Sequence, residues 1–230
     1  MYTFSVIIPT FNENNIIRDC VCHIKKIQKD VEIIIVDGGS TDNTVGVVSD
    51  EAVLVYSSPL GRGTQCNYGA KRARGSILLF LHADTKLPFD AFGQINNVFK
   101  NGRTKIATFR MKFDFNHWLL QCYEYFTRFD SIFTLFGDQC IVVRKSFFEA
   151  IGGFPDWPLF EDVRILQKAR GRTKIVSLPG PVITSARKFI KNGLLRQQIH
   201  NGIFLLRYLC GASPHLLARE YSGNSRKYGL

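Results

Sequence analysis

Four short runs of mainly apolar residues mark the first part of the chain. They cover residues 4–8, 31–36, 52–56 and 77–81. Runs of this length are typical of strands that are buried on both faces, as in a parallel sheet. Between the first two runs, apolar side chains recur at the spacing of one helix face: Ile16, Ile17, Cys20, Val21, Ile24 and Ile27. This alternation of strand and helix predicts an α/β fold.

A polar cluster follows each of these four runs. The clusters are "PTFNEN" at 9–14, "DGGSTD" at 37–42, "SSPLGRG" at 57–63 and "HADTK" at 82–86. In an open parallel sheet, ligands bind beyond the carboxyl ends of the strands. The clusters therefore predict a site at that edge of the sheet, and "STDNT" at 40–44 offers N-caps for a following helix.

The pattern changes after residue 100. Residues 104–115 alternate like an antiparallel or mixed strand, and an aromatic segment covers 117–136. A helical pattern follows "FED" at 160–162, and residues 173–187 predict a pair of strands. We find no linker rich in Pro, Gly or Ser, so we expect one domain over 1–188 with a helical C-terminal extension over 189–230.

The chain is basic, with 30 Lys and Arg against 19 Asp and Glu and a net charge of +11. Such a surface favours anionic partners, which include nucleotides, acidic lipid surfaces and nucleic acid. No helix-turn-helix, zinc-finger or RNA-binding aromatic motif occurs, so no nucleic acid partner is expected. The sequence leaves the oligomeric state open.

Location and membrane contact are predicted from the ends of the chain and from its cysteines. We find no basic leader before the first apolar run and no apolar segment of about 20 residues. The six cysteines form no CxxC pair, which favours free thiols and a cytoplasmic location. Basic and apolar residues interleave in the tail, which can lie peripherally on the anionic inner face of the plasma membrane or pack its apolar face on the domain.

The glycine pattern "GRGTQCNYG" at 61–69 matches neither of two common nucleotide-binding motifs. Its spacing differs from the dinucleotide fingerprint G-x-G-x-x-G, and no Gly-Lys-Ser/Thr of a P-loop is present. The segment instead predicts a loop that continues as a helix with a basic face.

The order of six motifs resembles glycosyltransferase family 2. The motifs are "VIIPTFNEN", "IIIVDGGSTDNT", "GRGTQCNYGAKRARG", "LLFLHAD", "GDQCIVVRKSFFEAIGGF" and "LFEDVRI", and they span the chain up to about residue 190. The chain looks most like a subgroup with His-Ala-Asp in place of Asp-x-Asp. The resemblance implies the GT-A fold, a Rossmann-like three-layer sandwich with a mixed, mainly parallel sheet. It also implies a nucleotide-binding half over 1–100 and an acceptor-binding half over 101–188.

The resemblance further implies an inverting transfer from a nucleotide-diphosphate sugar, with a UDP-sugar favoured, to a saccharide or lipid hydroxyl. The donor contacts expected in this way, together with basic and amide side chains suited to phosphate and ribose, are Pro9, Thr10, Glu13, Asp37, Gly38, Arg62, Gln65, Asn67, Lys71, His82, Ser185 and Arg187. Helix capping for Asp37, a helix-dipole position for Glu13 and plain solvation of the basic residues remain open alternatives.

The resemblance assigns a divalent metal, Mn²⁺ or Mg²⁺, to Asp84 and His82. Such an ion stabilises a departing diphosphate as a Lewis acid. His82 stands where the family usually has an aspartate, and imidazole suits Mn²⁺ better than Mg²⁺. The alternative for Asp84 is the cap of a helix over 87–99.

The acceptor side is predicted from the second half of the chain. The resemblance makes Asp162 the general base, and it places Gly137, Asp138, Trp157, Phe160 and Glu161 near the acceptor. The alternatives are helix capping by the acidic pair and ordinary core packing of the aromatic residues. Two rival functions remain, a nucleotidyltransferase of related fold and a catalytically inactive basic protein that binds nucleotides or membranes. The nucleotidyltransferase is disfavoured because no Gly-rich basic loop follows the first predicted strand.

Overall fold

The computed structural model describes residues 3–49, 51–131 and 137–227. One mixed sheet of eight strands has the order β3-β2-β1-β4-β7-β6-β8-β5. The strands are β1 (Phe4–Thr10), β2 (Glu32–Asp37), β3 (Leu54–Ser57), β4 (Ile77–Phe80), β5 (Thr85–Lys86), β6 (Ile106–Phe113), β7 (Ile141–Arg144) and β8 (Val176–Thr184). The helices are α1 (Ile17–Ile27), α2 (Arg62–Arg72), α3 (Ala91–Phe99), α4 (Trp118–Phe126), α5 (Lys145–Ala150), α6 (Glu161–Arg170), α7 (Arg187–Asn192), α8 (Leu194–Leu209) and α9 (Pro214–Lys227).

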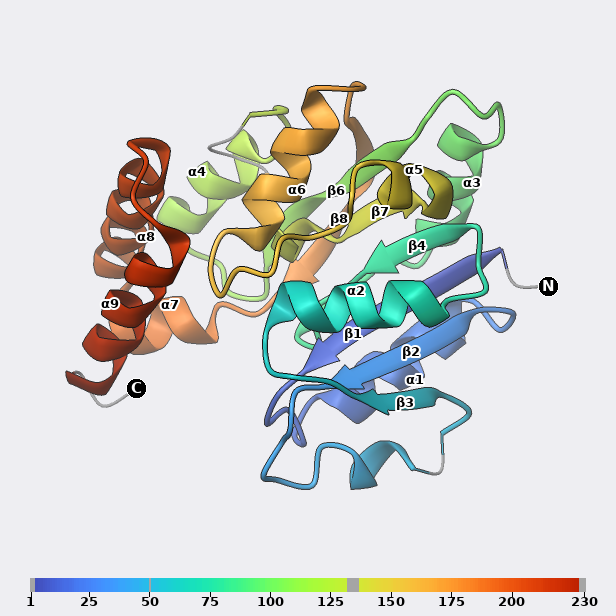
Figure 1. Ribbon diagram of the computed structural model, residues 1–230, viewed down its shortest axis with the longest axis horizontal. Helices are drawn as coiled ribbons and strands as arrows, with labels where there is room; N and C mark the ends of the chain where they lie inside the picture. Colours follow the sequence, from blue (N-terminus) through green and yellow to red (C-terminus); the bar gives the residue numbers. More distant parts are fainter. Residues whose placement is uncertain (1–2, 50, 132–136, 228–230) are drawn as a thin grey trace.

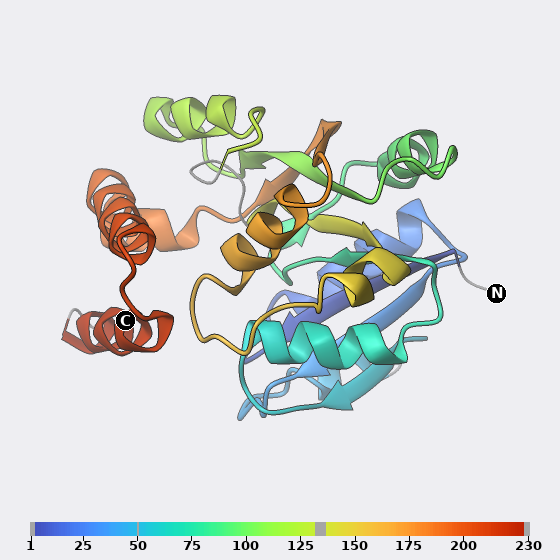
Figure 2. The ribbon, with the colours of Figure 1, turned by 45° about the horizontal axis from the view of Figure 1, so that its top comes forward.

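Helices cover both faces of the sheet, so the domain has three layers (Figures 1 and 2). Alternate strand residues divide between the two cores: Val6 and Ile8 pack with α1 and α3, whereas Ile7 packs with α2, α5 and α6. This division follows from the pleat, which points successive side chains to opposite faces. It also explains why the strands are apolar without interruption.

The first four strands and the later four pair differently. Strand β1 lies parallel to both β2 and β4, and β2 lies parallel to β3. Strand β7 is antiparallel to β4 and β6, which makes the sheet mixed as expected. The predicted strand pair over 173–187 is wrong, because β8 is one strand that pairs with β6 on one side and β5 on the other. A register shift between Phe109 and Arg110 lets β8 follow β6 past Pro179 and Pro181.

Two local predictions are corrected by the structure. Among the described residues between β2 and β3 no α-helix forms, and the segment contains a 3-10 turn at Gly46–Val48. The Asp42 carboxylate accepts hydrogen bonds from the Thr44 side chain and the backbone N–H of Asn14, so it closes a loop instead of capping a helix. The helix predicted over 87–99 begins at Ala91 with Asp90 as its N-cap. Asp84 therefore does not cap it.

Helices α7, α8 and α9 gather with α4 at the carboxyl edge of β1 and β4 (Figures 1 and 2). Phe204, Leu205 and Leu217 are buried there, but several apolar side chains of α8 stay exposed. Part of the tail thus packs on the domain, and its contact with a membrane stays a prediction. Of the helices described here, none is long and apolar enough to cross a membrane.

Candidate active site

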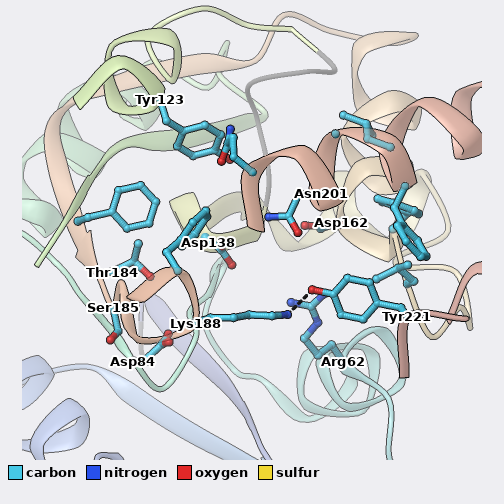
Figure 3. A pocket seen from close by; sticks show the side chains of 18 residues that line it. Arg62, Asp84, Tyr123, Asp138, Asp162, Thr184, Ser185, Lys188, Asn201 and Tyr221 are labelled. Carbon is cyan, nitrogen blue, oxygen red and sulfur yellow. Dashed lines mark hydrogen bonds between the residues drawn. The ribbon is translucent and has the colours of Figure 1, made fainter. Parts of the chain in front are cut away.

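A hollow of about 350 Å³ lies at the carboxyl edge of the sheet. Three aspartates from distant parts of the sequence line it: Asp84 follows β4, Asp138 precedes β7 and Asp162 lies in the first turn of α6. Figure 3 shows these three side chains around the same space, with Arg62 from α2 and Lys188 from α7 beside them. Acidic and basic groups therefore converge where parallel sheets bind their ligands.

Asp84 occupies the partly buried side of this hollow. Burial raises the pKa of its carboxyl group, and the nearby Asp138 carboxylate raises it further, whereas His82 and Arg187 lower it. A carboxylate in this setting gains from an added cation. The neighbouring hydroxyls of Thr85 and Thr184 lie 3.2 Å apart and fix the end of β5 against β8.

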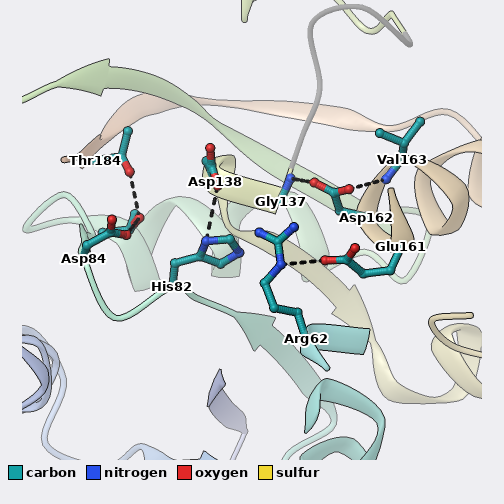
Figure 4. A network of polar contacts seen from close by, with 10 residues as sticks. Arg62, His82, Asp84, Gly137, Asp138, Glu161, Asp162, Val163 and Thr184 are labelled. Carbon is teal, nitrogen blue, oxygen red and sulfur yellow. Dashed lines mark hydrogen bonds and ion pairs between the residues drawn. The ribbon is translucent and has the colours of Figure 1, made fainter. Parts of the chain in front are cut away.

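His82 is held by Asp138. Its Nδ1 lies 3.2 Å from the Asp138 Oδ1 (Figure 4). A Cβ atom added to Gly137 would lie 3.3 Å from the His82 Nε2 and 3.1 Å from the Asp162 Oδ2. The absence of a side chain at Gly137 thus lets the imidazole and the Asp162 carboxylate lie close to its backbone.

Asp162 is fixed by two backbone groups. The N–H of Gly137 donates to its Oδ2 at 2.7 Å, and the N–H of Val163 donates to its Oδ1 at 2.8 Å. Phe160, just before the helix, has a left-handed backbone with φ of 63°. Such a conformation in a bulky residue is uncommon and recurs at functional sites, and here it turns the chain so that α6 begins beside the hollow.

Glu161 lies behind Asp162 and is only 3% exposed. Its Oε1 pairs with the Arg62 Nε at 2.8 Å, and its Oε2 is buried without a hydrogen-bond partner among the described residues. Burial raises the pKa of this carboxyl group to about 7, a rise that Arg62 opposes and Asp162 favours. Arg62 is consequently held at the wall of the hollow by a buried acid.

A second predicted group lies at the ends of β1 and β2. The Asp37 carboxylate accepts hydrogen bonds from the backbone N–H groups of Gly39 and Ser40 at 2.9 and 2.8 Å. The Gln65 amide donates to the carbonyl oxygens of Thr10 and Val36. These bonds organise the loop that the sequence assigned to the nucleotide.

Gly38 lies in the same group, and the structure gives its small size a reason. A Cβ atom at this position would lie 2.8 Å from the Leu60 side chain and 3.2 Å from the Gln65 Nε2. A larger residue would therefore push the Gly-rich loop away from the strand ends. Contact with a nucleotide stays a prediction for this group.

A comparison with family models decides what this arrangement is. The model described as glycosyl transferase family 2 matches residues 5–148, which is more than half of the chain. This chain belongs to glycosyl transferase family 2. The family expected from the motifs is confirmed, whereas the subgroup defined by His-Ala-Asp stays a prediction.

Curated relatives of this glycosyl transferase family 2 chain share part of its length. Over 109 residues it is 28% identical to the Low-salt glycan biosynthesis hexosyltransferase Agl6 of Haloferax volcanii. This match covers 46% of this chain and 26% of that protein. Over 92 residues it is 34% identical to a PGL/p-HBAD biosynthesis glycosyltransferase of Mycobacterium tuberculosis. This match covers 36% of this chain and 36% of that protein. The chain thus spans only about a quarter to a third of these relatives.

Solved structures establish the fold. The crystal structure of S. aureus TarS 1-349 in complex with UDP-GlcNAc superposes with a TM-score of 0.67 at 21% identity, over 80% of this chain and 58% of that one. Mannosyltransferase PcManGT from Pyrobaculum calidifontis, in complex with GDP-Man and Mn²⁺, superposes with a TM-score of 0.64 at 18% identity. This match covers 95% of this chain and 69% of that one. The predicted GT-A fold, with its mixed and mainly parallel sheet, is confirmed.

Six of the predicted residues of this family member line the hollow: Arg62, Asp84, Asp138, Phe160, Asp162 and Ser185. A second, smaller pocket shares Arg62 and Asp162 with it and is also lined by Pro9, His82, Gly137 and Glu161. Glu13 lies near Asp84. Burial raises the pKa of the Glu13 carboxyl group most, and the charge of Asp84 raises it further.

Other predicted residues lie elsewhere. Asn67 exchanges two hydrogen bonds with the backbone of Phe154, and Trp157 packs beside Tyr208. Lys71 is exposed in the last turn of α2, about 13 Å of helical rise from the end that faces the hollow. The structure does not bring these three side chains to the hollow.

Sequence reasoning missed the contribution of the C-terminal helices. Arg187 lies near the hollow, where its guanidinium is 3.8 Å from the Glu13 carboxylate and lowers the pKa of Asp84, and its neighbour Lys188 lines the hollow. Lys188 donates a hydrogen bond to the Tyr221 hydroxyl. Tail residues Asn201 and Phe204 complete the wall. The basic, apolar composition of the tail was visible in the sequence, but its position over the site was not.

Proposed function

We propose that this chain transfers a sugar from a nucleotide-diphosphate sugar, preferably a UDP-sugar, to a hydroxyl group of an acceptor, with inversion at the anomeric carbon. The observation that carries the proposal is that Asp84 and Asp162 line one hollow although 78 residues separate them in the sequence. The complexes of TarS with UDP-GlcNAc and of PcManGT with GDP-Man support the donor class.

Asp162 acts as the general base in this proposal. It takes the proton of the acceptor hydroxyl while the hydroxyl oxygen bonds to the anomeric carbon and the bond from that carbon to the diphosphate breaks. Attack from the face opposite the leaving group inverts the centre. The two backbone N–H groups that bind Asp162 hold its carboxylate in place, and a positioned base contributes roughly 10²–10⁴-fold to the rate.

The carboxylates of Asp84 and Asp138 fit a divalent cation, Mn²⁺ or Mg²⁺, that is shared with the donor. Within the described residues no group of three or more His, Cys, Asp and Glu could hold a metal by itself. Sites for Mg²⁺ commonly use one or two carboxylates together with substrate phosphates, which suits this arrangement. When bound, the ion would supply Lewis-acid stabilisation of the diphosphate charge. His82, tied to Asp138, would orient that carboxylate or ligate the ion.

Arg62 and Lys188 add positive charge to the same hollow. The Arg62 guanidinium is oriented by Glu161, and side-chain charges of this kind stabilise developing negative charge in a partly dry site. We infer a cytoplasmic location. The acceptor in this proposal is a saccharide or lipid hydroxyl.

A donor screen tests the proposal. The chain is incubated with a panel of nucleotide-sugars, acceptors and Mn²⁺, and released UDP or GDP and the anomeric configuration of the product are measured. Formation of a nucleoside triphosphate and a sugar 1-phosphate when pyrophosphate is added, with no nucleoside diphosphate released, would favour a nucleotidyltransferase. A protein that binds nucleotides without turnover would support the inactive alternative.

Asp162→Asn should lower turnover by about 10²-fold or more while UDP binding persists, because the amide cannot accept the proton. The matched control is Asp19→Asn, which alters an exposed aspartate in the first turn of another helix, α1. Equal turnover of the Asp162 variant and the wild type would remove Asp162 from the mechanism.

A further inference from the structure

Helix α8 carries an apolar face that the described protein leaves uncovered. Leu195, Ile199, Ile203 and Leu206 are 50–59% exposed. Their spacing of four, four and three residues puts them on one side of the helix. We call these four residues the α8 stripe. The exposed face of a helix in water normally carries polar residues, so the α8 stripe needs a partner.

Exposed aromatic side chains lie on the neighbouring helix. Trp118, Tyr125 and Phe126 of α4 are 65%, 51% and 54% exposed. Helix α4 contacts α8, and both views of the molecule place the two helices together at the same end (Figures 1 and 2). Aromatic side chains of this kind are enriched where proteins meet the headgroup region of a bilayer.

The charge of the C-terminal segment at this end is one-sided. From residue 185 to the C-terminus the only acidic residue is Glu220, against eight basic ones, so this segment carries +7 of the net +11. The basic residues are Arg187, Lys188, Lys191, Arg196, Arg207, Arg219, Arg226 and Lys227. Glu220 is already paired with Arg207, at 2.5 and 3.0 Å between their side-chain atoms. The partner of this surface should therefore carry negative charge.

The geometry points to an anionic lipid bilayer as the partner of the end formed by α4 and α7–α9. A second copy of the chain would bring like charges together, and a nucleic acid would meet the lysines and arginines but leave the α8 stripe in water. A bilayer with acidic lipids satisfies both features, since its headgroups pair with the basic residues and its interface takes up the apolar side chains.

This attachment also bears on the site, a step that rests on the proposed function. A different side of α8 lines the hollow, with Gln198, Asn201, Gly202 and Leu205. These residues follow the same helical spacing, turned by about a third of the circumference from the α8 stripe. Docking through the stripe would thus hold the hollow close to the lipid surface, where a hydroxyl acceptor in the membrane could enter it.

Vesicle co-sedimentation of the full chain tests the inference. We expect binding to vesicles of phosphatidylcholine with about 30% phosphatidylserine and about tenfold or more loss of partitioning into pure phosphatidylcholine. Raising the salt from about 0.1 M to about 1 M should weaken binding similarly, because the Debye length shortens to about 3 Å. Wild-type protein that fails to sediment, or that binds both vesicle types equally, overturns the inference.

The α8 stripe is tested by the double variant Ile199→Glu and Ile203→Glu, which should lose about tenfold or more of its affinity for the anionic vesicles. The control is Phe89→Glu, which places one glutamate at a 73% exposed apolar position beside His23 of α1 and should bind as the wild type does. Thermal unfolding of each variant checks that it is folded. If the double variant does not fold, Lys191→Glu takes its place in the vesicle assay and should also weaken binding.

Two outcomes contradict the inference directly. One is unchanged vesicle binding by the folded double variant. The other is a wild-type dimer in solution that the same substitutions dissociate, which would assign the surface to a second copy. Vesicle binding needs no donor sugar, so a failed transferase assay would not contradict the lipid result. Failure to bind vesicles would likewise leave the result of the transferase assay unchanged.

Discussion

At the scale of single residues, the acidic side chains of the site differ in what surrounds them. Asp162 accepts two backbone hydrogen bonds, whereas Glu161, next in the chain, is buried against Arg62 with one oxygen unpartnered among the described residues. The sequence predicted the importance of this pair and the role of Asp162. It did not predict the burial of Glu161, because a helix places adjacent residues about 100° apart and only the packing of α6 decides which one faces the core.

The pH dependence of stability should report on Glu161. Its pKa is raised from 4.5 to about 7, so between these values the folded protein holds a proton that the unfolded chain has lost. The free energy of unfolding should therefore fall as pH rises through this window, by up to about 1.4 kcal/mol per pH unit. Urea unfolding of the wild type and of Glu161→Gln across the window measures the difference in slope.

The substitution removes the titrating group, so the Glu161→Gln profile should lack this fall. Glu149→Gln, at an exposed position of α5, serves as the control and should keep the wild-type slope. Parallel profiles for the wild type and Glu161→Gln would show that the pKa of Glu161 is not raised.

At the scale of elements, the buried strands and most helices were predictable because their apolar periodicity is strong. The errors fell where local signals compete with tertiary contacts. Caps at residues 40–44 predicted a helix, yet these polar side chains bond back to the β1–α1 loop, as the 2.9 Å bond from the Asn12 N–H to the Ser40 hydroxyl shows. Two prolines in 173–187 suggested a turn between strands, but β8 accommodates them by a shift of register against β6.

The junction of β1, β2 and α2 should depend on Gln65. This buried side chain bonds to the carbonyl oxygens of Thr10 and Val36 at 2.8 and 2.7 Å. Gln65→Ala should lower the free energy of unfolding by about 1–3 kcal/mol, because buried acceptors lose a donor. Gln121→Ala removes a surface amide that bonds Asn116 and should change it by less than about 0.5 kcal/mol. Equal effects of the two substitutions in chemical denaturation would contradict this role.

At the scale of the whole molecule, the site exists because distant segments meet. Asp84 comes from the turn after the fourth strand, Asp138 from the turn before the seventh, and Lys188 from the C-terminal helices. The clustering of the strand-end residues followed from the sequence, since parallel strands bring their carboxyl ends to one edge. The wall made by α7–α9 could not be predicted in this way. The periodicity of an amphipathic helix shows which of its faces is apolar, but not which surface of the domain that face packs against.

Joint binding of metal and nucleotide should depend on Asp84. In a thermal shift assay, UDP with Mn²⁺ should stabilise the wild type more than the sum of the two alone, because a cation between the carboxylates and the diphosphate links their binding. Asp84→Asn should lose this extra stabilisation while keeping part of the UDP effect. Asp30→Asn, at an exposed position before β2, should keep all of it. A full Mn²⁺ effect in the Asp84 variant would place the metal elsewhere.

The sequence by itself determined the family, the layered α/β architecture and the acidic residues at the strand ends, because these follow from periodicity and from motifs that are local in the chain. Tertiary structure decided which of those residues share a hollow, which carboxylate is buried and that the tail closes the site. The physical reason is that burial and long-range charge contacts depend on how elements pack, and packing is a property of surfaces that no single segment specifies.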